Sequence, residues 1–508
     1  MTLMRLALVS LLILATSPVR GADLAARDRD FLLQAVNAHA KESSEAALAI
    51  WRYAEVGYQE QESTAVLQKE LAAAGFTVKA GVADMPTSFV ATAGAGRPVI
   101  AILAEFDALP GLSQAAVAAR SPIEGKSAAH ACGHNLFGAG SAGAAIAIRE
   151  WLAARKLPGT IRVYGTPAEE GGAGKVYMVR AGLFDDVDMA LHWHAADRND
   201  ASQNGSNSNK SGKFRFHGVS SHAAAAPEKG RSALDAVEAM DMMANMMREH
   251  MPQQARLHYV ITRGGSAPNV VPDFAEVFYY VRHPDPEVVQ ALWERLTKIA
   301  QGAALGTGTT WDVEVIHGAY PLLPNHTLGH VMQAGLERVG GVQYDADETA
   351  FAQKVHATLT SPSRALGTER VVQPYAPEQH YGSTDVGDVS WTVPTVGLNT
   401  ATWVPGTAAH SWQAAAAGGM SIGIKGMENA SKVLALTVAR LYLDPALVKK
   451  ARAEFDAARG AHFVYRPMVG DRMPPLDFRD KRLRTSQQRV DQRHRDERQH
   501  DADRKRCI

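Results

Sequence analysis

The chain has 508 residues, of which 46% are hydrophobic and 21% charged, a composition typical of a globular protein rather than of a disordered or fibrous one. Its formal net charge is zero, so it has no general attraction to nucleic acid or to an anionic membrane. A chain of this length exceeds what one hydrophobic core holds, and we expect two domains.

The first 22 residues have the pattern of a secretory signal peptide. A basic start at residues 1–5 precedes an apolar run at residues 6–16, and small residues follow at 17–22. The apolar run fits a signal sequence and is too short to span a bilayer, although an uncleaved anchor helix is the alternative. We therefore expect cleavage near Gly21 or Ala22 and a periplasmic or secreted protein without stable membrane insertion.

The next part of the chain alternates between helical and strand patterns. Residues 25–71 predict two helices, and residues 141–152 predict another. Buried strands are expected at residues 98–106, 160–164 and 188–193. Apolar strands that alternate with amphipathic helices predict an α/β fold with a mostly parallel sheet and helices on both faces.

The pattern changes after residues 199–209, whose polar composition indicates a linker. Strands are expected at 212–219, 256–263, 275–282 and 310–316, and helices at 232–249 and 286–303. This β-α-β-β-α-β order is that of a ferredoxin-like fold. We therefore assign residues 209–321 to an inserted lid or dimerisation domain within an α/β domain formed by residues 23–208 and 322–446. The first inserted helix carries methionines that indicate packing or a subunit interface, namely Met240, Met242, Met243, Met246 and Met247.

Beyond the inserted domain the helix and strand pattern resumes. Residues 397–403 predict a late strand and residues 424–441 the last helix. Residues 479–508 form a charged tail with few apolar residues, for which we expect disorder, with a binding role as the alternative.

The segment His130-Ala-Cys132-Gly-His134 carries residue types that bind metals. Cys132 and Cys507 are the two cysteines of the chain, and we expect no disulfide between them. In an extended segment alternate residues share a face, which would bring His130, Cys132 and His134 together. Gly133 also permits a turn, so the sequence leaves open which of the three converge.

Further metal-binding residues follow predicted strands. Glu169 and Glu170 come after one strand, His192 and His194 after another, and His410 after a third. In open α/β sheets ligands collect beyond the carboxyl ends of the strands, so these segments predict a metal site there. For the adjacent glutamates alone, a solvated loop is the alternative.

The same segments carry a resemblance to a known family. Residues 130–134, 167–172 and 409–411 look like those of the di-metal aminoacylase/carboxypeptidase amidohydrolases, in the branch where cysteine replaces a bridging aspartate. Residues 105–114, 182–188 and 382–391 resemble most closely the B-subunit group of aminobenzoyl-glutamate hydrolases. The resemblance runs from about residue 30 to residue 445 and therefore excludes the signal peptide and the tail.

The resemblance implies a role for each matching residue. Cys132 would bridge two divalent ions, Zn²⁺ or Mn²⁺, and Glu169 would act as the general base. Asp107 would orient a ligand, with a turn-capping role as the alternative, and His130 and His192 are expected to pack rather than bind metal. The remaining metal ligands would be His134, Glu170, His194 and His410.

In the inserted domain the resemblance implies that His222 reaches the active site of a partner subunit in a homodimer and stabilises an oxyanion. Asn269 and Arg282 would approach the substrate, although a strand-end histidine and a turn asparagine are the plain alternatives. Asn135 departs from the aspartate that many members of the cysteine branch have, and it points to the aminobenzoyl-glutamate group.

The expected activity is metal-dependent hydrolysis of the amide bond of an N-acyl amino acid. p-Aminobenzoyl-glutamate, cleaved to p-aminobenzoate and glutamate, is the foremost substrate. A broader N-acyl-amino-acid or dipeptide hydrolase in the periplasm is the alternative, and a non-catalytic binding protein on the same fold is a second one. The partners expected are a small-molecule amide and a second copy of the chain, without nucleic acid.

Overall fold

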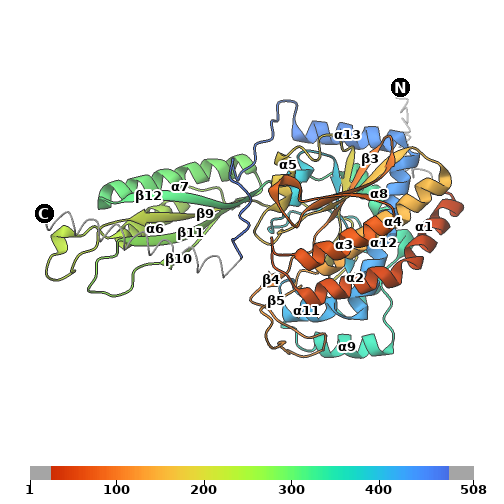
Figure 1. Ribbon diagram of the computed structural model, residues 1–508, viewed down its shortest axis with the longest axis horizontal. Helices are drawn as coiled ribbons and strands as arrows, with labels where there is room; N and C mark the ends of the chain where they lie inside the picture. Colours follow the sequence, from red (N-terminus) through yellow and green to blue (C-terminus); the bar gives the residue numbers. More distant parts are fainter. Residues whose placement is uncertain (1–23, 480–508) are drawn as a thin grey trace, which may run out of the picture.

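The computed structural model describes residues 24–479, which form a large α/β domain and an elongated smaller domain beside it (Figure 1). The predicted signal peptide at residues 1–22 and the tail beyond residue 479 lie outside the described residues. Within residues 24–479, no helix combines the length and the apolar character needed to cross a membrane.

The large domain is built on a six-stranded sheet in the order β1-β2-β6-β3-β7-β13. The pairs β6/β3, β3/β7 and β7/β13 are parallel, whereas β1/β2 and β2/β6 are antiparallel. Every residue of β3 is buried, as expected for a central strand covered on both faces. The mostly parallel α/β fold predicted from the sequence is confirmed. The strands are β1 (Thr77–Ala80), β2 (Phe89–Ala95), β3 (Val99–Ala104), β6 (Gly159–Gly165), β7 (Met189–Leu191) and β13 (Thr395–Val396).

Short strands and many helices complete this domain. Two small ladders pair β4 (Leu109–Pro110) with β5 (Ala128–Ala129) and β8 (His194–Ala196) with β14 (Asn399–Ala401). The helices are α1 (Ala26–Ala38), α2 (Ala40–Tyr53), α3 (Gln61–Ala73), α4 (His134–Arg155), α5 (Gly174–Arg180), α8 (His326–Val339), α9 (Ala346–His356), α10 (Val386–Ser390), α11 (Trp412–Gly418), α12 (Ser421–Leu443) and α13 (Pro445–Arg459).

Three helix predictions were wrong in their limits. Residues 25–71 form three helices instead of two, because the chain bends at His39 (φ −96°, ψ 5°) without a glycine or proline. Helix α4 begins at His134 rather than at residue 141, and its first turns are buried all round, so they lack the amphipathic period. Helix α13 follows the predicted last helix, with Asp444 as its N-cap.

The smaller domain has the strand order β10-β11-β9-β12, and all its pairs are antiparallel. With one helix after β9 and one after β11, this is the β-α-β-β-α-β arrangement expected from the sequence. A separate hydrophobic core lies between its sheet and its helices. The elements are β9 (Ser208–His217), α6 (Ala233–Arg248), β10 (Arg256–Arg263), β11 (Phe274–His283), α7 (Pro286–Thr307) and β12 (Thr310–Ala319).

Residues 199–209 are not the exposed linker that their composition indicated. Asn199 and Ser208 are 0% exposed, and Asn199 Nδ2 donates to the carbonyl oxygen of Glu369 at 2.7 Å. Most polar side chains of this stretch are buried and hydrogen-bond to distant segments, whereas Asn207 Oδ1 and Asn209 Oδ1 have no partner within residues 24–479. The stretch forms part of the wall of the main cavity.

The methionines of α6 divide between core and surface. Met240 and Met247 are buried in the core of the smaller domain, as a packing role predicts, whereas Met242 and Met246 are 62% and 61% exposed.

After α13, residues 460–479 cross from the large domain to the smaller one and back (Figure 1). Tyr465 donates its hydroxyl to Asp388 Oδ1 at 2.6 Å in the large domain, and Met468 packs in the core of the smaller domain. The crossing segment ends at Arg479, which reaches the main cavity.

Candidate metal centre

A cavity of about 920 Å³ lies beyond the carboxyl ends of β3, β6 and β7, between the two domains. The segments that follow these strands hold the acidic and histidine residues that the sequence singled out. This arrangement follows from the parallel sheet, whose strands end at one edge. The cavity brings together residues that lie far apart in the sequence, among them Cys132, Glu169, Glu170, His194 and His410.

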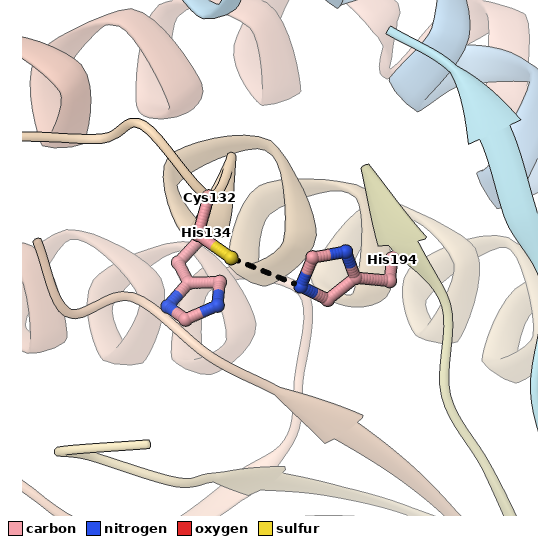
Figure 2. A group of neighbouring side chains, drawn as sticks. All are labelled: Cys132, His134 and His194. Carbon is pink, nitrogen blue, oxygen red and sulfur yellow. Dashed lines mark hydrogen bonds between the residues drawn. The ribbon is translucent and has the colours of Figure 1, made fainter. Parts of the chain in front are cut away.

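Cys132, His134 and His194 form one group in which ligand atoms lie within 4.8 Å of one another (Figure 2). Cys132 Sγ is 3.4 Å from His194 Nε2. Gly133 separates Cys132 from His134 with φ 78°, and a Cβ there would lie 2.3 Å from the Cβ of Ala195. Only glycine fits this close approach, and the resulting turn places His134 in the first turn of α4.

Cys132 also belongs to a second group, with Glu170 and His410, whose ligand atoms likewise lie within 4.8 Å. Glu170 Oε1 is 3.3 Å from His410 Nε2. The backbone N–H of His410 donates to the carbonyl oxygen of Ala131 at 2.9 Å, which ties the late His410 loop to the cysteine segment. The two groups therefore share one side chain, Cys132.

Asp107 contacts one member of each group, His134 and Glu170. Its Oδ1 is 2.9 Å from His134 Nδ1, and its Oδ2 accepts from the backbone N–H of Glu170 at 2.9 Å. With Nδ1 directed at Asp107, Nε2 of His134 is the nitrogen left to bind a cation.

The donor set fits divalent cations. His134 Nε2 and Glu170 Oε1 are buried and have no hydrogen-bond partner within residues 24–479. Each atom has one neighbour at ion-pair distance, Glu105 Oε2 at 3.0 Å and His410 Nε2 at 3.3 Å, and a cation would supply the aligned partner that buried polar atoms normally have. Burial raises the pKa of the Cys132 thiol, and two nearby cations would instead ionise it. Imidazole and thiolate suit zinc, and the carboxylate also suits manganese.

Glu169 lines the same cavity. Burial, followed by the charges of Glu105 and Glu170, holds its pKa well above the usual range. The preceding Ala168 has φ 58°, and its backbone N–H donates to Glu60 Oε1 at 2.9 Å. Glu60 is 0% exposed, and burial raises its pKa to about 8. Glu60 thus supports the turn that presents Glu169.

His130 and His192 belong to none of the candidate ligand groups within residues 24–479. His130 is 1% exposed, and its Nε2 is 3.1 Å from the carbonyl oxygen of Ile50. The extended arrangement that would put His130 beside His134 is therefore not adopted. His192 borders the cavity and packs against Gly397. A Cβ added to Gly397 would lie 2.5 Å from His192 Nε2. Asn135 donates Nδ2 to the carbonyl oxygens of Ala47 and Gly418, at 3.2 and 3.1 Å.

The three candidate site residues of the inserted domain differ in their position relative to the cavity. Arg282 on β11 lines the cavity. His222 and Asn269 are exposed and are absent from the cavity lining formed by residues 24–479. They lie next to each other, because His222 bridges to Val270 and the N–H of Ala223 donates to the carbonyl oxygen of Asn269.

Several residues of the site escaped the sequence analysis. Glu105 and Asp385 lie within segments that carry the family resemblance, residues 105–114 and 382–391, but they had no assigned role. Lys175 gave no signal, because it meets both carboxylates from a distant segment. Arg479 donates to the carbonyl oxygen of Glu170 at 2.6 Å from a part of the chain that its composition marked as tail. Long-range contacts of this kind leave no local pattern.

Comparisons with known proteins agree with this geometry. The model of peptidase family M20/M25/M40 matches residues 101–411. The chain is 40% identical to the B subunit of p-aminobenzoyl-glutamate hydrolase from Escherichia coli (strain K12), over 84% of this chain and 94% of that protein. It is 31% identical to Xaa-Arg dipeptidase of Mus musculus, over 80% and 87% of the two chains. The crystal structure of Bacillus subtilis YXEP, described as a dinuclear metal binding peptidase from the M20 family, has the same fold, with a TM-score of 0.53, 19% identity, and 80% and 99% of the chains covered.

Proposed function

The chain belongs to peptidase family M20/M25/M40 and is a hydrolase of amide bonds, and we propose that two divalent cations at Cys132 serve this hydrolysis. The observation that carries the proposal is the shared cysteine. Cys132 completes one ligand group with His134 and His194 and another with Glu170 and His410. One side chain that belongs to two groups is what a ligand bridging two ions requires. We propose zinc or manganese as the ions.

Glu169 and Asp107 have different roles in the proposed hydrolysis. Bound cations would polarise the substrate carbonyl and acidify a water molecule. Glu169 takes the proton from that water and delivers it to the leaving nitrogen, since one carboxyl in reach of both atoms serves as base and then as acid. Asp107 fixes the ring of His134 and the backbone of Glu170, which keeps both ligands in register.

We propose that the active unit is a homodimer joined through the inserted domain. His222 and Asn269 lie together on the surface of that domain and outside the cavity lining of their own chain within residues 24–479. In a dimer, His222 of a second copy would reach this cavity and donate a hydrogen bond to the oxyanion. A second, different subunit is the alternative raised by the name of the Escherichia coli relative.

We propose p-aminobenzoyl-glutamate as the substrate, with p-aminobenzoate and glutamate as products. The 40% identity to a hydrolase named for this compound supports the choice. Arg282 borders the cavity from the inserted domain and offers a guanidinium for a substrate carboxylate. A broader N-acyl-amino-acid or dipeptide hydrolase is the second candidate, favoured by the 31% identity to a dipeptidase and by the signal-like residues 1–22. Those residues also support a periplasmic or secreted location.

The test is hydrolysis of a substrate panel by the purified, metal-loaded protein. Release of p-aminobenzoate from p-aminobenzoyl-glutamate, with the highest kcat/KM of the panel, is expected. N-acetyl amino acids and dipeptides ending in arginine serve as comparison substrates. Turnover of these compounds without release of p-aminobenzoate would replace the first candidate by the second.

A further inference from the structure

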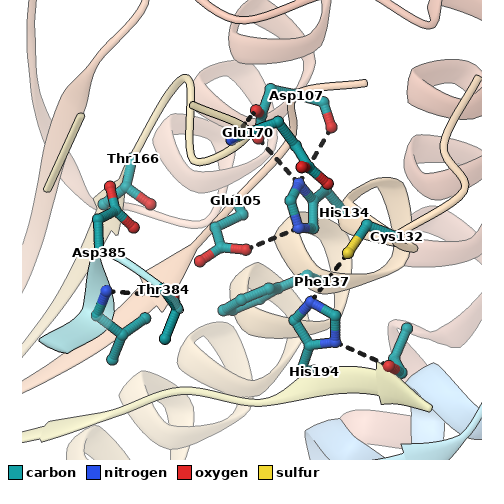
Figure 3. Close-up of polar contacts among 12 residues, drawn as sticks. Glu105, Asp107, Cys132, His134, Phe137, Thr166, Glu170, His194, Thr384 and Asp385 are labelled. Carbon is teal, nitrogen blue, oxygen red and sulfur yellow. Dashed lines mark hydrogen bonds and ion pairs between the residues drawn. The ribbon is translucent and has the colours of Figure 1, made fainter. Parts of the chain in front are cut away.

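A buried lysine, Lys175, pairs with two buried carboxylates, Glu105 and Asp385, beside the candidate ligands. Figure 3 shows the two carboxylates. Lys175 Nζ, near the start of α5, is 2.7 Å from Glu105 Oε1 and 2.7 Å from Asp385 Oδ1. All three side chains are 2% exposed or less. The backbone N–H of Lys175 also donates to Asp385 Oδ2 at 2.9 Å. One cation here faces two carboxylates next to the candidate metal centre.

The second oxygen of Glu105 faces His134. Glu105 Oε2 is 3.0 Å from His134 Nε2, but this ion-pair distance lacks hydrogen-bond alignment, and neither atom has a hydrogen-bond partner within residues 24–479. Because Asp107 engages Nδ1 of His134, a proton on that nitrogen leaves Nε2 with a lone pair. Two lone-pair atoms at this distance repel each other unless a proton or a metal ion lies against both.

The 3.0 Å separation is that of two neighbouring ligands on one ion. Metal bonds of about 2.1 Å at right angles place adjacent ligand atoms about 3 Å apart. Figure 3 shows Glu105, His134, Cys132 and His194 around the ring of Phe137, and Glu105, Cys132 and His194 line the main cavity. Glu105 also forms a group with His134 and Glu169 whose ligand atoms lie within 4.8 Å.

We propose that Glu105 is a further ligand of the cation held by His134 and that Lys175 and Asp385 hold its carboxylate in the binding orientation. This inference rests on the proposed function only in requiring a divalent cation at Cys132, His134 and His194. A carboxylate added to two imidazoles and a thiolate raises the coordination number and the oxygen content of that position. The change favours Mn²⁺ over Zn²⁺, because zinc prefers four ligands and manganese accepts more oxygen.

The test compares metal binding by the metal-free wild type and by Glu105→Gln, and it needs no turnover. Co²⁺ serves as the probe, since four-coordinate cobalt absorbs visible light far more strongly than six-coordinate cobalt. We expect Glu105→Gln to gain visible absorption per bound Co²⁺ and to lose about 10- to 100-fold in Mn²⁺ affinity, with a smaller loss for Zn²⁺. Glu348→Gln is the matched control, because Glu348 is a 2% exposed carboxylate paired with Lys425 outside the cavity.

An unchanged cobalt spectrum and an unchanged Mn²⁺ affinity in folded Glu105→Gln would overturn the inference. If that variant does not fold, Glu105→Asp replaces it, because aspartate keeps the charge beside Lys175 but withdraws the carboxylate from His134. The same gain in absorption is expected from Glu105→Asp, and a wild-type spectrum would again overturn the inference. Failure of the wild type to take up Co²⁺ would instead refute the metal dependence itself.

Discussion

Asp107 gives a sharp test of how the candidate ligands are held. Its Oδ1 faces His134 Nδ1 and its Oδ2 accepts from the N–H of Glu170, both at 2.9 Å. Asp107→Asn keeps the shape but replaces one oxygen by an NH₂ group. In either orientation of the amide, that NH₂ meets a donor, the ring N–H of His134 or the backbone N–H of Glu170. The substitution therefore breaks one charge-assisted hydrogen bond and creates one donor–donor contact.

A hydrogen bond to a charged group contributes about 1.5–3 kcal/mol, which corresponds to about a 10- to 150-fold loss of metal affinity. Isothermal titration of the metal-free protein with Zn²⁺ or Mn²⁺ measures this loss. Asp188→Asn is the matched control, because Asp188 also uses both oxygens, for Arg97 and for the N–H of Val99, at the other end of β3. Metal affinity of Asp107→Asn equal to that of wild type would refute the reasoning.

Three further predictions follow from the same geometry. Glu169→Gln is expected to bind both metals but to lose about 10²- to 10⁴-fold in kcat, because it removes proton transfer and no proposed ligand. Metal analysis with steady-state kinetics checks this prediction, and an active variant would refute Glu169 as the general base. Burial raises the pKa of Asp388 to about 7, so the native state binds a proton more tightly than the unfolded state, and this contribution to stability is present at low pH and is lost as the pH rises through 7. Between pH 5 and 7, the unfolding free energy of wild type is therefore expected to fall with pH more steeply than that of Asp388→Asn, by at most about 1.4 kcal/mol per pH unit. Equal slopes of unfolding free energy against pH, measured by denaturant melts, would contradict this prediction. Mixing inactive His222→Ala and Glu169→Gln chains is expected to restore activity, because a mixed dimer has one site with Glu169 and the partner's His222; no recovery after subunit exchange would place His222 in its own chain's site or outside catalysis.

Strand patterns carried much of the fold prediction. Residues 256–263 were predicted as a strand with the bounds that β10 has, and the β-α-β-β-α-β order followed from hydrophobic period and length. Helix α4 was predicted short, since its first turns are glycine- and alanine-rich and buried all round. Such a helix has no polar face, so hydrophobic periodicity does not mark its beginning.

The candidate ligands were accessible to sequence reasoning because parallel strands end at one edge and gather the loops that follow them. Glu169, Glu170 and His194 are placed by this rule. The supporting residues were not accessible. Lys175 meets Asp385 across 210 positions of sequence, and a buried lysine has the same local pattern as an exposed one. Asn199 has a turn-like polar composition around it, yet it is buried because Glu369 satisfies its amide.

The central claim is that Cys132 bridges two cations. Anomalous diffraction from crystals grown with Zn²⁺ or Mn²⁺ tests it most directly. The account predicts two peaks, each within metal-bond distance of Cys132 Sγ, about 2.3 Å for zinc. One peak is expected to contact His134 and His194, and the other Glu170 and His410. A single peak, or two peaks of which one does not contact Sγ, would contradict the bridging role of Cys132.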